Sequence, residues 1–336
     1  QHENRSQRKN YLPLEKARQN KTDIDWSKTR IKKPNILGRR VFKDYPLEEL
    51  RNYIDWGPFF IAWQMKGKFP AILEDEKYGE EARKLYDDAN RLLDRIIKQK
   101  LLKAQAVIGI YPANAVGDDI EVYKDENRDK VLTRLHTLRQ QSEKRPGQPN
   151  KALSDFIAPK DSGINDYIGG FAVTAGIGAD KLVQKFEDNN DDYNAILTKS
   201  LADRLAEAMA ELMHEKIRKQ YWGYAPDESF SNNDLIREKY TGIRPAAGYP
   251  AQPDHTEKPI LFDLLDVHET TGIRLTENLA MTPPASVSGL YFAHPESTYF
   301  NVGNISKDQV KDYARRKNMS VKEVERWLSS NLAYEK

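Results

Sequence analysis

The chain has 336 residues, of which 39% are hydrophobic and 31% are charged, and its formal net charge at pH 7 is +2. This length can bury a substantial core in one large domain or two, and so small a positive charge argues against a dedicated nucleic-acid-binding protein. The absence of cysteine excludes disulfides and thiolate chemistry and suits the cytoplasm, and no apolar run approaches the length of a membrane span.

Residues 1–43 are predicted to be a linker that wraps around a folded domain rather than folding alone. They are rich in lysine and arginine, and Trp26 is their one obvious anchor. A basic arm that binds an acidic partner is the alternative interpretation of these charges. The polar start is not a signal peptide, and because it lacks methionine we expect a segment of a longer polypeptide, with its folded domain at residues 44–336.

Apolar side chains at helical spacing predict two long helices. One starts near Gly79 and carries an apolar stripe from Leu85 to Ile97, and the other runs from Asp191 to Tyr221. Four short segments have the composition of strands: 106–111, 120–123, 286–292 and 299–302.

The chain closes with two helices that are predicted to begin at capping boxes. In each box a serine is followed three residues later by a glutamine or a glutamate, Ser306 with Gln309 and Ser320 with Glu323. Strands and helices are interleaved along the chain without regular alternation. We therefore expect an α+β fold, with mixed helices around a twisted, largely antiparallel sheet.

The segment from Arg244 to His255 contains three prolines and one glycine, which exclude a helix interior and a central strand. It is predicted to be a rigid, extended loop. Its arginine has a planar guanidinium that suits a carboxylate or phosphate, and Gly248 lets the backbone approach a ligand closely just before Tyr249. A stiff surface turn is the alternative interpretation of the same residues.

Three other motif-like patterns each lack a part that their chemistry needs. Gly176-Ile-Gly178 has Asp180 where a nucleotide-binding loop needs a third glycine, so an ordinary turn before a helix is the alternative. Asp266-Val-His268 lacks the glycine-rich continuation of a cobalt-ligating loop, and Glu211-x-x-His214 is half of a di-iron motif without a second copy. We therefore expect neither a metal site nor a corrin bound by this chain itself.

A series of ordered segments, from about Asp44 onward, carries a resemblance to a known family. They are the loop at 244–255 and the segments 53–60, 111–120, 153–159, 166–174, 221–226, 285–295 and 312–317. Together they resemble the activation domain of cobalamin-dependent methionine synthase, which binds S-adenosylmethionine. The family commonly has cysteine where this chain has Gln252, which implies that this side chain takes no part in the chemistry.

The resemblance implies a binding site for S-adenosylmethionine. Arg244 can clamp the α-carboxylate of the ligand, and Pro245 restricts the backbone from which the arginine projects. Asp55 is assigned to the α-ammonium group, and Glu207 is a second acidic contact. The full set of predicted ligand-binding residues is Asp55, Glu207, Arg244, Ala246, Gly248, Tyr249, Tyr299 and Phe300.

Several of these residues have a purely structural alternative. Asp55 is then a local cap or ion-pair partner, Glu207 a solvated charge on a helix, and Tyr299 and Phe300 ordinary strand core. No catalytic acid or base is expected in the chain, because a sulfonium methyl group is already activated and positioning dominates its transfer.

The function that the resemblance implies is reductive reactivation. The chain would present the methyl group of S-adenosylmethionine to a cobalamin held by a partner domain, for remethylation of cob(II)alamin. A flavodoxin or flavodoxin-like reductase would supply the electron, and the whole enzyme would be a cytoplasmic methyltransferase that methylates homocysteine from methyltetrahydrofolate. The alternatives are an independent small-molecule methyltransferase and a non-catalytic ligand-sensing module. Neither a nucleic acid nor a membrane is expected as a partner.

Overall fold

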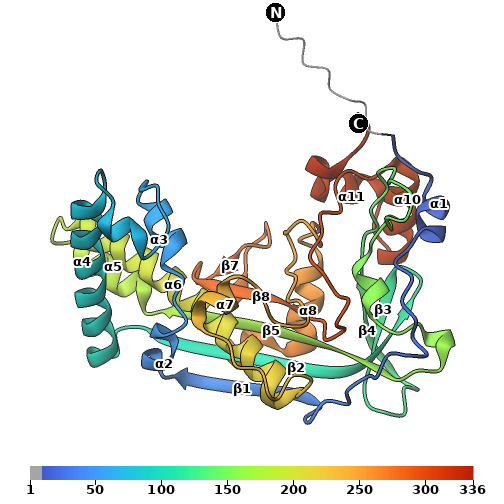
Figure 1. Ribbon diagram of the computed structural model, residues 1–336, viewed down its shortest axis with the longest axis horizontal. Coiled ribbons are helices and arrows are strands. Elements are labelled where there is room, and N and C mark those ends of the chain that lie inside the picture. The colour runs from blue at the N-terminus through green and yellow to red at the C-terminus, as the bar shows by residue number, and fades with distance from the viewer. Residues whose placement is uncertain (1–9, 336) are drawn as a thin grey trace, which may run out of the picture.

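The computed structural model describes residues 10–335, in which one antiparallel sheet of six strands runs along the molecule (Figure 1). The strand order is β4-β3-β2-β5-β8, and β1 also pairs with β2. The predicted α+β fold with a largely antiparallel sheet is confirmed. The six strands are β1 (Gly38–Tyr45), β2 (Lys103–Val116), β3 (Asp119–Tyr123), β4 (Val131–His136), β5 (Asp166–Ile177) and β8 (Ser286–Tyr291).

Helices surround this sheet, and a small separate ladder joins β6 (Arg274–Leu275) to β7 (Met281–Thr282). Within residues 10–335, no helix is both long and apolar enough to cross a membrane. The α-helices are α1 (Leu14–Gln19), α2 (Leu47–Arg51), α3 (Trp56–Ala62), α4 (Gly79–Gln99), α5 (Ala179–Glu187), α6 (Asp192–Lys216), α7 (Asn232–Ile236), α8 (Glu257–Leu265), α9 (Val267–Thr271), α10 (Lys307–Lys317) and α11 (Val321–Trp327).

The long central strands β2 and β5 connect the two ends of the molecule (Figure 1). They pair from Lys103 opposite Ile177 to Ala113 opposite Asp166. On the other side of β2, β1 pairs with the first part of the strand and β3 with its last residues. Nearly all residues of β2 and β5 are buried, because other parts of the chain cover both faces of the sheet.

Side chains alternate between the two faces of the sheet, and a separate apolar cluster lies on each face. In β2, Ala106, Ile108 and Ile110 belong to the cluster that contains α2 to α6. Val107 and Tyr111 belong instead to the cluster that contains α8 and α9. A third cluster holds α10 against α11 at the opposite end from α3 and α4 (Figure 1).

Most of the predicted elements are confirmed. The two long helices are α4 and α6, and a short π-helix, Ile217–Tyr221, continues α6. The strands expected at 106–111, 120–123 and 286–292 correspond to parts of β2, to β3 and to β8. The strand expected at 299–302 is wrong: this segment is irregular, and the amide of Val302 donates to Pro250 in the proline-rich loop at 2.9 Å.

Only one of the two predicted capping boxes forms. Ser320 accepts a hydrogen bond from the amide of Glu323 at 3.2 Å, and the glutamate accepts one from the Ser320 amide at 2.9 Å. The box at Ser306 is wrong, although the serine does precede α10. Gln309 is buried, and its side chain bonds the backbone N–H and carbonyl of Arg139 at 2.8 and 2.9 Å instead of returning to the helix start.

The pattern at Gly176-Ile-Gly178 has a packing explanation. Gly176 lies within β5, and Gly178 precedes α5 with a φ of +93°, which favours glycine. A β-carbon at Gly178 would lie 2.6 Å from the carbonyl oxygen of Leu101. The glycines therefore serve an ordinary turn between a strand and a helix.

The N-terminal segment 10–37 lies against the domain. Trp26 packs edge-on against His294, with ring centroids 4.9 Å apart, and Arg18 pairs with Asp118 at 2.8 Å. β1 begins at Gly38, so the predicted end of the linker at residue 43 falls inside the first strand.

Candidate functional site

The proline-rich loop runs from Arg244 to Thr256 and is irregular, as its prolines predict. Its start lies beside β8, because the amide of Leu290 donates to the carbonyl of Pro245 at 2.9 Å. A tight turn follows, in which the amide of Gly248 donates to Gln252 at 2.7 Å and the amide of Tyr249 donates to Ala246 at 3.2 Å. The loop thus holds its shape through its own backbone.

Two residues inside the loop have structural reasons for their identity. Gly248 has a φ of +93°, and a β-carbon there would lie 2.2 Å from the ring of His255. Gln252, at the position where the family commonly has cysteine, is buried and donates its side-chain amide to the carbonyl of His136 at 2.7 Å. Gln252 therefore anchors the loop to the sheet.

Arg244 is the centre of a group of polar side chains. Its Nη2 lies 2.8 Å from Oε2 of Glu211, and its Nη1 donates to the hydroxyl of Tyr240 at 3.1 Å and to Nδ1 of His214 at 3.2 Å. Its backbone N–H donates to the hydroxyl of Tyr299 at 3.0 Å. Burial opposes the charge of Arg244, but the carboxylate of Glu211 raises the pKa of this guanidinium above its usual value.

An acidic face of α6 lies along this site. Asp203, Glu207, Glu211 and Glu215 are four residues apart, so they share one side of the helix. Burial raises the pKa of Glu207, which also interacts electrostatically with Arg244. Of these four residues, the family motifs indicate only Glu207 as a ligand contact, although the regular spacing of four is a signal for the other three.

Asp55 both caps a helix and keeps a free oxygen. It precedes α3, and its Oδ1 accepts a hydrogen bond from the amide of Gly57 at 2.9 Å. Its Oδ2 has no hydrogen-bond partner among residues 10–335. The neighbouring Tyr53 donates its hydroxyl to Glu215 of α6 at 2.6 Å, which brings the start of α3 to the acidic face.

The two aromatic residues of the predicted site lie in different surroundings. Tyr299 is 39% exposed and contacts Arg244 through its hydroxyl. The ring of Phe300 packs edge-on against Phe156, with centroids 6.4 Å apart, and is part of the apolar cluster that includes α8. Tyr249 is 62% exposed on the loop.

The residues that the sequence analysis missed are the ones that contact the Arg244 side chain. Glu211 and His214 were noticed only as half of a metal motif, and Tyr240 was not noticed at all. Within residues 10–335, no group of three or more potential metal ligands comes together. The spacing of Glu211 and His214 instead places both on the side of α6 that meets Arg244.

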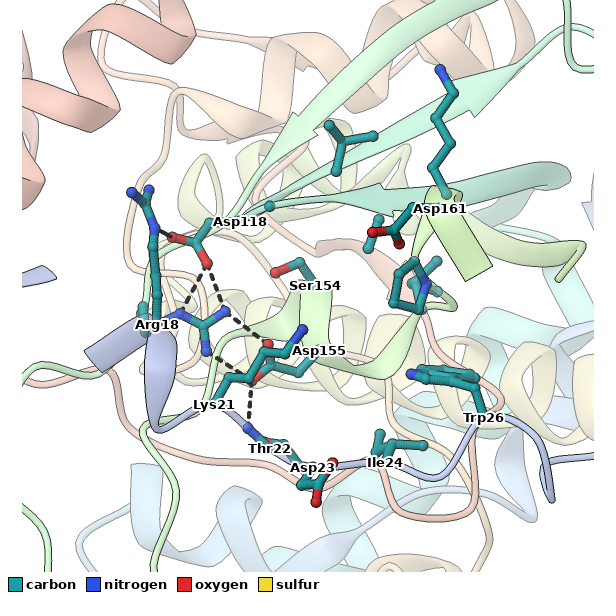
Figure 2. A pocket seen from close by; sticks show the side chains of 17 residues that line it. Arg18, Lys21, Thr22, Asp23, Ile24, Trp26, Asp118, Ser154, Asp155 and Asp161 are labelled. Atoms are coloured by element: carbon teal, nitrogen blue, oxygen red, sulfur yellow. Dashed lines mark hydrogen bonds and ion pairs between the residues drawn. The ribbon is translucent and has the colours of Figure 1, made fainter. Parts of the chain in front are cut away.

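A sizeable cavity lies elsewhere in the described residues. It has a volume of about 660 Å³ and lies between the N-terminal segment and the loop after β2. Figure 2 shows Arg18, Asp118 and Asp155 on one side of it and Trp26 on another. The arginine and the aspartates are paired with one another or with Arg139, and none of the predicted site residues lines the cavity. The cavity is therefore separate from the site at Arg244.

Comparison with known proteins identifies the family. The sequence profile of the family described as "Vitamin B12 dependent methionine synthase, activation domain" matches residues 46–318. A solved structure, described as the MetH reactivation domain bound to AdoHcy, is 55% identical in sequence and superposes with a TM-score of 0.95. The match covers 97% of this chain and 99% of the other. The chain therefore belongs to the family of activation domains of vitamin B12-dependent methionine synthase.

Proposed function

We propose that the chain binds S-adenosylmethionine beside Arg244 and presents its methyl group to a cobalamin held by a partner domain. The observation that carries this proposal is the 55% identical reactivation domain, whose structure is bound to AdoHcy. That ligand differs from S-adenosylmethionine by the methyl group and the positive charge on sulfur. The same pocket chemistry would therefore serve both molecules.

Arg244 fits the α-carboxylate of such a ligand. A guanidinium has five N–H groups. The two on Nη1 are directed at His214 and Tyr240, and Nη2 has one carboxylate partner, Glu211. The Nε–H and one N–H of Nη2 have no partner among residues 10–335, and two such groups can hold a carboxylate through paired hydrogen bonds.

Acidic side chains fit the positive charges of the ligand. The free Oδ2 of Asp55 is suited to the α-ammonium group, and Glu207 adds a second negative charge beside Arg244. The exposed ring of Tyr249 and that of Tyr299 offer surfaces for the adenine, and the backbone of Ala246 and Gly248 can approach its edge. Phe300 would support the pocket from the apolar side, through its contact with Phe156.

Binding and orientation are the work of this chain. S-adenosylmethionine supplies a methyl group that the positive charge on sulfur already activates. The residues that bind the ligand therefore need to orient it and exclude water rather than move a proton. We propose that the partner is the cobalamin domain of the same enzyme. We further propose that a flavodoxin or flavodoxin-like reductase supplies the electron, and that the whole protein is a cytoplasmic methyltransferase that methylates homocysteine.

Titration calorimetry with S-adenosylmethionine tests the site. We expect one-to-one binding to the purified chain, and a loss of roughly 2–5 kcal/mol in the Arg244→Ala variant, because the ligand carboxylate loses its partly buried partner. Arg145→Ala is the matched control, since Arg145 is exposed and forms no ion pair among residues 10–335. Unchanged affinity in Arg244→Ala would refute this pocket, and no binding by the unmodified chain would refute the function.

A further inference from the structure

We propose that Glu211, His214 and Tyr240 are positioning residues that hold the Arg244 guanidinium with its Nε edge turned toward the ligand carboxylate. This inference rests on the proposed function, because it assigns a purpose to contacts on the far side of the arginine. None of the three residues was expected to take part in binding from the sequence.

The three residues contact Arg244 from two separate segments of the chain. Glu211 and His214 lie three residues apart on α6, and Tyr240 lies four residues before the arginine in the chain. Their contacts are 2.8 Å from Glu211 to Nη2, 3.1 Å from Tyr240 to Nη1 and 3.2 Å from His214 to Nη1. All three residues are less than 9% exposed, so water does not compete effectively for these contacts.

The contact with His214 defines the state of the imidazole. Arginine has only donors, so Nδ1 of His214 must accept and the ring proton must reside on Nε2. Burial lowers the pKa of His214 well below its usual value, and the positive charges of Arg218 and Arg244 lower it further. The neutral ring is stacked on Tyr291 with centroids 5.2 Å apart, which fixes its plane.

A cation–π contact with Arg218 also fixes the position of the Tyr240 ring. The guanidinium of Arg218 lies 4.2 Å from the centre of the Tyr240 ring, and Arg218 is paired with Glu228 at 2.8 Å. This arrangement fixes the hydroxyl that accepts from Arg244. Because the Nη1 N–H groups and one side of Nη2 are occupied, the guanidinium can offer only its Nε edge to a second carboxylate.

The test compares two ligands that differ in one group. S-adenosylmethionine has the α-carboxylate, whereas decarboxylated S-adenosylmethionine keeps the sulfonium, the amine and the adenosine. Tyr240→Phe removes only the hydroxyl that accepts from Arg244. We expect this variant to bind S-adenosylmethionine about fivefold more weakly and to change the affinity for the decarboxylated ligand by less than about twofold.

Tyr224→Phe is the matched control for Tyr240→Phe. The hydroxyl of Tyr224 is also buried but has no hydrogen-bond partner among residues 10–335, so neither affinity should change. His214→Leu should weaken the binding of S-adenosylmethionine more than that of the decarboxylated ligand. His214→Asn should restore most of the loss, because its amide oxygen can accept near the position of Nδ1. Thermal melting confirms that each variant is folded.

The outcomes separate this inference from the proposed function. Equal weakening of both ligands in Tyr240→Phe, or an asparagine variant no better than the leucine variant, would overturn the positioning role. If Arg244→Ala abolishes the preference for the carboxylate while Tyr240→Phe and His214→Leu keep it, only the present inference fails. If the unmodified chain binds neither ligand, both proposals fail.

Discussion

At the scale of single residues, negative charge exceeds positive charge around Arg244. The charged side chains that interact with one another here are Asp203, Arg204, Glu207, Glu211, Glu238 and Arg244. Burial raises the pKa of Glu207 and of Glu238, which shows that their charges are costly without a cationic partner. S-adenosylmethionine brings two positive charges and one negative charge, so it offsets this excess better than a neutral ligand would.

This excess predicts a pH dependence of binding through Glu207. Burial raises the pKa of Glu207 above 4.5, so in the free protein its carboxyl takes up a proton at a higher pH than an exposed glutamate does. Only the ionised carboxylate attracts a cationic ligand. The affinity for S-adenosylmethionine should therefore be highest above this pKa and decline as the pH falls through it, which calorimetry at a series of pH values measures.

The matched variant for this prediction is Glu207→Gln. It should lower the affinity by about three- to tenfold at neutral pH and should flatten the decline at lower pH, because the titrating group is gone. S-adenosylhomocysteine, which lacks the sulfonium charge, should show the shallower dependence even with the unmodified chain. An equally steep decline in the variant would contradict the assignment to Glu207.

Asp55 allows helix capping and ligand binding to be separated. Asparagine is as good an N-cap as aspartate, so Asp55→Asn should leave the free energy of unfolding nearly unchanged while removing the charge meant for the ammonium group. Asp55→Ala should lose about 1 kcal/mol of stability as well as affinity. Urea denaturation and calorimetry on both variants measure the two effects. If Asp55→Asn binds S-adenosylmethionine with full affinity, Asp55 serves only as a helix cap and does not contact the ligand.

At the scale of elements, α6 carries a repulsive face in the middle of the molecule. Like charges four residues apart destabilise an isolated helix by about 0.2–0.5 kcal/mol per pair. α6 forms because its other sides are apolar and packed, with Leu201, Leu205 and Met209 fully buried. The acidic face is offset by partners from other elements, such as Arg244 at Glu211 and Tyr53 at Glu215.

The two C-terminal helices predict losses of different size for the same substitution. Ser320→Ala removes a hydroxyl that accepts from the Glu323 amide, and should cost about 1 kcal/mol of unfolding free energy. Ser306→Ala should cost much less, because the Ser306 side chain makes no capping bond. Denaturant unfolding of both variants measures the difference. Equal losses would contradict the hydrogen-bonding pattern at these two helix starts.

At the scale of the whole molecule, the candidate site is assembled from segments far apart in the sequence. It combines the start of α3, one face of α6, the proline-rich loop and Tyr299. In Figure 1, α6 extends from the helical end with α3 and α4 toward the centre of the sheet around β8. The long strands β2 and β5 run past both regions and carry the helices on either face.

This architecture predicts that the chain alone binds S-adenosylmethionine but does not transfer its methyl group. The site provides groups that hold a ligand, and the methyl acceptor is proposed to arrive with another domain. The isolated chain should bind S-adenosylmethionine but transfer no labelled methyl group to small acceptors, whereas adding the cobalamin domain and a one-electron reductant should start transfer. Methyl transfer without any corrinoid would favour an independent methyltransferase instead.

The amino-acid sequence by itself determined the features that depend on residues close together in the chain. The stripes of α4 and α6, the irregular loop after Arg244 and the capping box at Ser320 each depend on side chains within a few turns of one another. The ordered motifs also predicted the family correctly. These features could be predicted because local spacing decides which side of an element is apolar, and proline restricts the backbone wherever it occurs.

Only the tertiary structure decided which side chains meet. Gln309 was expected to cap its own helix but binds Arg139, 170 residues away, and the segment at 299–302 pairs with a loop rather than a strand. The contacts of Glu211 and His214 with Arg244 likewise join positions some 30 residues apart. The physical reason is that a buried polar group must find a partner wherever packing places one, and local sequence does not contain that information.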